Sequence, residues 1–108
     1  MDDDLPGVSD AFQAFLREAP AQAGAWMEAV QRLGAASALD AKTEALAYLA
    51  VLAAVRLTSG VPFHARHARS LGASRDEVIS AVLVGLPAVG NAVAQALPAA
   101  LAAFDTPE

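Results

Sequence analysis

Cysteine is absent from this chain of 108 residues. Its absence excludes disulfide bonds, thiolate metal ligands and thiol-based peroxidase chemistry by this polypeptide alone. A phosphate-binding loop, a dinucleotide-binding fingerprint, a Ser–His–Asp order and a calcium-binding loop are missing as well. We therefore predict no cofactor, and the lack of cysteine is typical of a cytoplasmic protein. The acidic residues 1–4 stand where a secretory signal would be basic, so we expect no export.

Basic residues are also scarce, with 7 Lys and Arg against 12 Asp and Glu and a net charge of −5 at pH 7. A face that binds nucleic acid has to neutralise phosphates, so this balance argues against nucleic acid as a partner. The arginines cluster in the middle of the chain, at Arg56, Arg66, Arg69 and Arg75. This cluster leaves room for a local anion site.

Charge is missing altogether between Val78 and Phe104. A membrane-spanning helix needs about 20 apolar residues, but glycines, prolines and two amides interrupt this stretch, and no basic anchor flanks it. We therefore expect no membrane span, and instead two helices that are apolar nearly all round. The chain is 56% hydrophobic, above the usual value of about 45–50%, which favours a homo-oligomer.

The apolar spacing and the capping signals predict an all-α domain of six helices, because no segment shows the sustained alternation of a strand. We expect these helices at about 10–18, 20–33, 41–58, 62–71, 75–85 and 89–104, the last one bent at Pro98. Trp26 and the phenylalanines are interpreted as packing residues. Residues 1–7 are expected to form a disordered acidic lead, followed by a single domain over 8–108.

Most of the candidate chemistry lies in residues 60–78, GVPFHARHARSLGASRDEV. Pro62 suits the first turn of a helix, and Gly72 suits its end in the left-handed conformation. A capping box of serine and glutamate then starts the next helix. His64 and His67 are three residues apart, so their imidazoles project from neighbouring parts of one helical face.

Three phrases in the chain together resemble the carboxymuconolactone decarboxylase family, which includes the alkylhydroperoxidase D-like proteins. They are LDAKTE at 39–44, HAR at 64–66 and GASRDEV at 72–78, and the resemblance covers residues 39–104. It implies an all-α, alkylhydroperoxidase D-like fold that assembles as a trimer or hexamer, with sites near the subunit boundaries. In the peroxidase branch a Cys-x-x-Cys pair ends four residues before the histidine. Leu57 and Gly60 stand there in this chain, so it resembles the decarboxylase branch.

The resemblance implies that His64 is the working histidine. Imidazole takes and returns a proton near neutral pH, as decarboxylation or double-bond migration in an unsaturated lactone requires. The family also implies Glu44 as the partner of this histidine in a proton relay. Glu44 precedes Leu57 by thirteen residues, one more than in the family pattern. The alternative for Glu44 is a charge that favours the helix dipole from the first turn.

Three further residues are candidates for substrate binding. Arg56 can clamp a carboxylate through two hydrogen bonds, or it can simply favour the dipole at the end of its helix. Tyr48 offers a hydroxyl donor, or it packs in the core. His67 can contact substrate, whereas a metal held by His67 and His64 would need further ligands, and we predict no metal.

Two functions are consistent with these residues. The first is a cofactor-free acid–base enzyme, decarboxylase-like or isomerase-like, that acts on a small carboxylate or lactone. The second is a non-enzymatic oligomeric binding module that kept the scaffold after losing the thiols. A solvent-reachable His64 that converges with Glu44 and an arginine on one cavity favours the enzyme. A hydrogen-bonded His64 in an aliphatic pocket favours the module.

Overall fold

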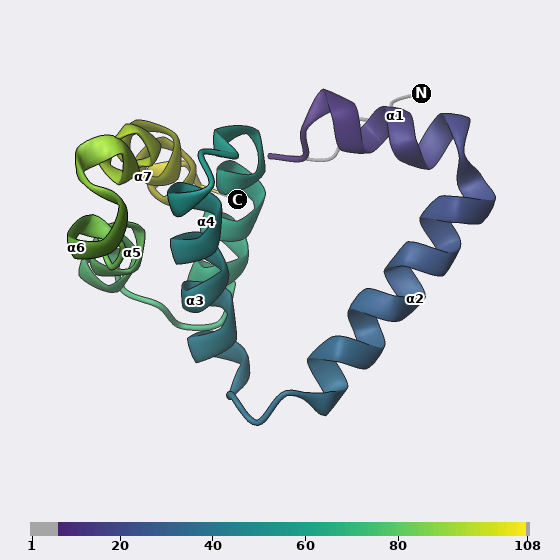
Figure 1. Cartoon of the computed structure of the whole chain (residues 1–108), viewed down its shortest axis with the longest axis horizontal. Coiled ribbons are helices and arrows are strands. Elements are labelled where there is room, and N and C mark those ends of the chain that lie inside the picture. The colour runs from purple at the N-terminus through teal and green to yellow at the C-terminus, as the bar shows by residue number, and fades with distance from the viewer. Residues whose placement is uncertain (1–6, 108) are drawn as a thin grey trace.

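The structure is a computed structural model that describes residues 7–107, and it contains no strand within that range. Its helices are α1 (Asp10–Glu18), α2 (Pro20–Ala36), α3 (Ala41–Ala54), α4 (Val61–Ser70), α5 (Arg75–Val82), α6 (Leu86–Val89) and α7 (Leu97–Asp105), with 3-10 segments η1 (Thr58–Gly60) and η2 (Asn91–Ala96). The predicted all-α class is confirmed. Figure 1 shows two parts, a body of α3 to α7 and an arm of α1 and α2. None of the helices described is both long enough and apolar enough to cross a bilayer.

The predicted starts of α3 and α5 are confirmed, and each has a side-chain capping bond. The Asp40 carboxylate accepts the backbone N–H of Thr43 at 2.8 Å and begins α3. At α5, the Ser74 hydroxyl accepts the N–H of Glu77 at 3.0 Å, while the Glu77 carboxylate accepts the N–H of Ser74 at 2.9 Å. Gly72 follows α4 with a φ of 96°, in the conformation that its lack of a side chain permits.

The end of α3 differs from the prediction, because the helix stops at Ala54 rather than at residue 58. The N–H of Leu57 donates to the carbonyl of Leu52 at 2.9 Å, and Arg56 takes a φ of 62°. This pattern is a Schellman motif, in which a left-handed residue closes the last turn. Glycine usually fills that position, and the arginine there hid the end of the helix from sequence analysis.

The predicted helix over 89–104 is wrong as one continuous element. Gly90 has φ 85° and ψ −172°, a conformation open essentially to glycine alone, and it separates α6 from η2. Pro98 lies in the first turn of α7, where its missing N–H costs little. Pro98 therefore starts a helix instead of bending one.

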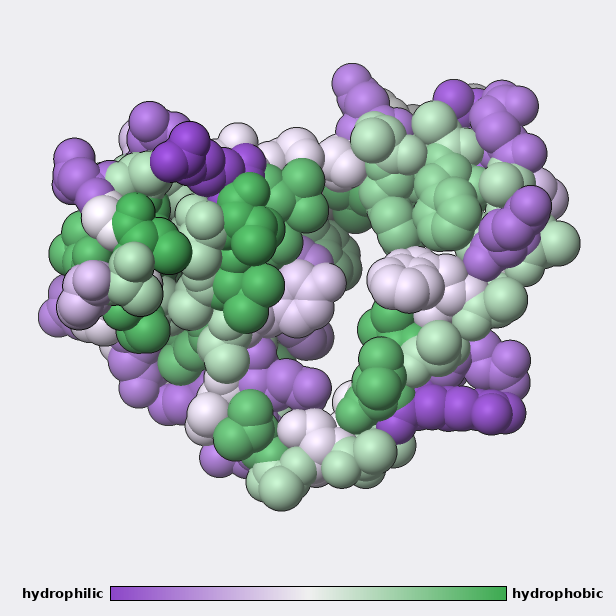
Figure 2. Space-filling model, in the orientation of Figure 1, coloured by the Kyte–Doolittle hydropathy of each residue, from purple (hydrophilic) through white to green (hydrophobic). Residues whose placement is uncertain are grey.

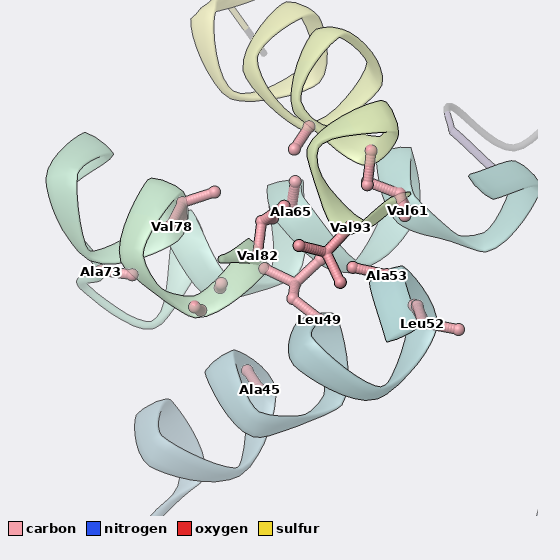
Figure 3. Close-up of a cluster of buried hydrophobic side chains, with 14 residues drawn as sticks. Ala45, Leu49, Leu52, Ala53, Val61, Ala65, Ala73, Val78, Val82 and Val93 are labelled. Atoms are coloured by element: carbon pink, nitrogen blue, oxygen red, sulfur yellow. The ribbon is translucent and has the colours of Figure 1, made fainter. Parts of the chain in front are cut away.

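The core lies between α3, α4, α5, η2 and α7. Its largest fully buried side chains are Leu49, Val61, Val78, Val82 and Val93, and Figure 3 shows them converging from these elements. Many of the remaining core positions are alanines. Small side chains let the helix axes approach closely, so a short chain still forms a packed body.

The arm contributes almost nothing to this core. No residue of α1 is buried, and Ala23 is the buried residue of α2. Trp26 is 54% exposed, so its interpretation as a packing residue is wrong for the single chain. Figure 2 shows an open gap between α2 and the body. Residues 1–6, where the acidic lead was expected, lie outside the described residues, and the extent of the domain over 8–108 stays a prediction.

Candidate functional site

His64 is in the first turn of α4, and other residues of this helix pack it against the core. Val61, Ala65 and Ala68 point into the core, and this fixes the direction of the neighbouring side chains. The imidazole stacks on the Tyr48 ring from α3, with centroids 4.2 Å apart and planes inclined by 16°. Two adjacent helices therefore hold the ring in one orientation.

A row of four rings continues from this contact. Phe63 meets His64 edge-on at 5.2 Å and 86°, and its own face is nearly parallel to His67 at 6.3 Å and 8°. The order is Tyr48, His64, Phe63, His67. Sequence analysis missed Phe63, although its place beside His64 on an otherwise polar helix surface is a signal that could have been used.

The electrostatics of His64 favour the neutral imidazole. Burial lowers the pKa of His64 below its ordinary value of 6.5, and the positive charge that His67 can carry lowers it further. The His64 ring makes no hydrogen bond or ion pair with any residue in the range 7–107. Because no buried side-chain nitrogen in that range lacks a partner, the His64 nitrogens reach solvent. One of them can therefore accept a proton from a ligand while the other donates.

Glu44 lies on the same face of α3 as Tyr48, one helical turn earlier. It is half-buried, and among the described residues no hydrogen bond or ion pair joins it to His64. The relay role of Glu44 stays a prediction. His67 is exposed, and within the described part of the chain no three His, Cys, Asp or Glu side chains are grouped so as to hold a metal.

The arginine cluster divides into two groups in the structure. Arg69 donates to the carbonyls of Phe104 and Thr106 at 2.8 and 3.0 Å, and Arg75 pairs with Asp105 at 2.9 Å, which lowers the pKa of that carboxyl. These two arginines hold the end of α7 onto α4 and α5. Arg56 instead is exposed after α3, and among residues 7–107 it has no hydrogen-bonding or ionic partner.

A groove that sequence analysis did not foresee lies on a different side of α3. It is open, has a volume of about 530 Å³, and is lined by Thr43, Leu46, Ala47, Ala50, Asp76, Glu77, Ser80, Ala81 and Val84. Lys42 of α3 forms an ion pair with Glu77 of α5 at 3.2 Å, which joins the two helices that line the groove. His64 does not line this groove, so the histidine site is a separate surface.

Comparison with known protein families finds a match over most of the chain. The model of the carboxymuconolactone decarboxylase family matches residues 20–103, which run from α2 into α7. The comparisons with curated proteins and with solved structures find no match. The chain contains no cysteine, so it lacks a Cys-x-x-Cys pair. Since the matched region spans well over half of the chain, this protein belongs to the carboxymuconolactone decarboxylase family.

Proposed function

We propose that this protein is a cofactor-free acid–base enzyme that decarboxylates or isomerises a small carboxylate or lactone, with His64 as the proton carrier. One observation carries the proposal: a half-buried imidazole with a lowered pKa and solvent-reachable nitrogens, held in place by stacking. A general base has to be unprotonated at the working pH and fixed relative to its substrate. His64 meets both requirements.

Three other residues supply binding rather than proton transfer. The Tyr48 ring stacks on the working imidazole, and His67 lies beyond it, against Phe63. Arg56 makes no hydrogen bond or ion pair among the described residues and follows the end of the same helix as Tyr48. A guanidinium recognises a carboxylate through two parallel hydrogen bonds. Glu44 is proposed as the partner that accepts the proton from His64 once a substrate bridges the two residues.

The experiment that tests this function is an NMR titration of both imidazoles, repeated with a panel of small lactones and dicarboxylates. The His64 midpoint is expected below 6.5, and it should move again with one class of ligand. His64→Gln should abolish turnover of that ligand and keep the helical content, whereas His67→Gln, which removes an imidazole assigned to binding, should weaken the ligand response and keep turnover. A His64 signal that ignores every ligand contradicts the proposal.

A second candidate is a non-enzymatic binding module on the same scaffold, assembled as a homo-oligomer. Leu57 and Gly60 favour it, because no nucleophilic side chain replaces the thiol pair. A Cβ added at Gly60 would stand 3.3 Å from a methyl of Leu52, so this region is packed with aliphatic groups. A protein that assembles normally but whose His64 never responds to ligand would support this function over catalysis.

A further inference from the structure

The groove between α3 and α5 is a surface that the proposed function does not use. Its volume of about 530 Å³ lies within the range of about 300–1,000 Å³ that is usual for small-molecule sites. An apolar lining with a few polar groups is the usual composition of such sites. Five of the nine residues that line this groove are apolar, namely Leu46, Ala47, Ala50, Ala81 and Val84. The groove therefore has the size and the lining of a site for a small organic molecule.

The helices α3 and α5 run side by side in the same direction, so the groove has two distinct ends. At the beginning of both helices, Lys42 of α3 pairs with Glu77 of α5 at 3.2 Å. Beyond the end of α5, a Cβ added at Gly85 would lie 3.9 Å from the Cβ of Ala54, the last residue of α3. Both helices also contribute to the buried core, so the groove is a fixed surface of the folded body.

The polar groups of the groove gather at the end where the two helices begin. Thr43 lies in the first turn of α3, and Asp76 and Glu77 lie in the first turn of α5. The opposite end, at Ala50 and Val84, is apolar. A rise of 1.5 Å per residue places Ala50 about 10 Å along α3 from Thr43. The groove is thus a track about 10 Å long that is polar at one end and apolar at the other.

The charges at the polar end do not balance. The carboxylate of Glu77 is engaged by Lys42 at 3.2 Å. Asp76, beside it, makes no hydrogen bond or ion pair within residues 7–107. Its neighbour Arg75 donates to both carboxylate oxygens of Asp105, at 2.9 and 3.0 Å. The negative charge of Asp76 therefore has no counterion of its own in the described part of the chain, and it borders the apolar track.

This arrangement distinguishes between classes of ligand. A carboxylate would meet the like charges of Asp76 and Glu77 on a protein whose net charge is −5, and like charges at a binding surface suppress binding. A neutral apolar molecule would cover the track but gain no attraction from Asp76. An organic ammonium ion gains both the charge pairing and the burial of its chain.

We propose that the α3–α5 groove binds a small organic cation, a primary amine on an apolar chain, with its ammonium group at Asp76 and its chain directed toward Val84. His64 does not line this groove, and the ligand proposed for His64 carries the opposite charge. The amine site is therefore independent of the proposed function.

The geometry predicts which part of the ligand supplies the affinity. An exposed ion pair changes the dissociation constant by a factor of up to about five. Each methylene group that the groove covers adds a factor of up to about four. Affinity should therefore rise along the series n-butylamine, n-hexylamine and n-octylamine, and it should stop rising at n-decylamine, whose chain extends beyond the track. An affinity that does not depend on chain length would contradict the proposed orientation.

Chemical-shift mapping by NMR with n-octylamine as the probe locates the site. The amide signals of Ala47, Ser80 and Val84 are expected to move, whereas that of Leu33, an apolar residue of α2 that is 68% exposed, should not. n-Octanoate and n-octanol at the same concentration should bind more weakly, because neither can pair with Asp76. Equal binding of n-octanoate, or shifts centred on α2, would overturn the proposal.

Removal of the Asp76 charge tests the polar end. Asp76→Asn keeps the shape of the side chain and should weaken n-octylamine binding by up to about fivefold. Asp10→Asn is the matched control, because it removes an acid from the first turn of α1, outside the groove. Equal weakening in the two variants would mean that net charge alone attracts the amine, and this would overturn the site at Asp76.

A substitution that fills the groove tests the apolar track. Ala47→Phe should eliminate detectable n-octylamine binding, whereas Val51→Phe, which adds the same ring at a site on α3 that is 59% exposed and outside the groove, should not. Circular dichroism verifies that both variants keep their helical content. Wild-type affinity in Ala47→Phe would overturn the proposal. If n-octylamine binds as expected while His64 responds to no carboxylate or lactone, the amine site holds and the proposed function is refuted.

Discussion

The turn after α3 offers a sharp test of backbone strain, because Arg56 occupies a left-handed position with φ 62°. A non-glycine residue in that conformation costs roughly 1–2 kcal/mol. Replacement by glycine removes this cost, but it also gives the unfolded chain more freedom, which opposes folding by about 0.4–1 kcal/mol. The difference predicts that Arg56→Gly stabilises the protein by about 0.5–1 kcal/mol, or roughly 2–6 °C in Tm for a domain of this size.

Arg56→Ala is the matched control for this substitution. Both variants remove the guanidinium, which has no partner among residues 7–107, but alanine keeps the Cβ that makes the left-handed conformation costly. Thermal and urea unfolding followed by circular dichroism, at one fixed protein concentration, should place Arg56→Gly above both the wild type and Arg56→Ala. An Arg56→Gly variant no more stable than Arg56→Ala would refute the assignment of strain to this turn.

The same pair of variants addresses why an arginine is found there. Strained backbone is retained most often where the side chain has a function. If Arg56 clamps a substrate carboxylate, both variants should lose the His64 response to carboxylate ligands, although one is more stable than the wild type. Stability and ligand response would then change in opposite directions in Arg56→Gly.

Four further outcomes are expected. Leu49→Ala, at a fully buried site, should cost about 2–5 kcal/mol in urea unfolding, whereas Val84→Ala at an exposed site should change stability by less than about 0.5 kcal/mol. The pKa of His64 is lowered in the folded protein, so the unfolded chain binds a proton at His64 at higher pH than the folded chain does. The contribution of His64 to the free energy of unfolding is therefore fully present above pH 6.5 and is lost as the pH falls toward the folded pKa. If His64→Gln shows the same dependence of stability on pH as the wild type, the reasoning is contradicted. Tyr48→Ala uncovers the imidazole and should raise the His64 midpoint in NMR toward 6.5. Ser74→Ala removes the cap of α5 and should lower the free energy of unfolding by about 1 kcal/mol; no change would mean that the capping box adds no stability.

Signals that act within one turn of the chain were sufficient to predict where α3 and α5 start. Asp40 and Ser74 each satisfy a backbone N–H three residues away, so the residues that make the bond are adjacent in the sequence. Helix ends were less predictable where the residue type does not indicate a left-handed backbone conformation. Glycine allows a positive φ but does not require one, so Gly90 alone does not predict a break. Arg56 adopts a positive φ that arginine disfavours.

The apolar face of α2 could be predicted from the sequence, but the surface that covers it could not. The spacing from Trp26 to Leu33 predicts a helix with one apolar face, and α2 is that helix. Periodicity does not say which surface covers the face. In the single chain Trp26 and Leu33 stay exposed, at 54% and 68%. The identity of the covering surface depends on tertiary and quaternary geometry, which has no signature in the order of residues.

The histidine site depends on the packing of α3 against α4 in the same way. The chain turns back after α3, so the beginning of α4 lies nearer to the C-terminal half of α3 than to its first turn. Tyr48 is therefore within stacking distance of His64, while Glu44 lies one turn, about 6 Å, farther along the axis. The residue spacing placed both side chains on one face of α3, but only the helix crossing decides which of them meets the imidazole. A relay from His64 to Glu44 consequently needs a molecule between the two side chains, which makes bound substrate a condition for the relay.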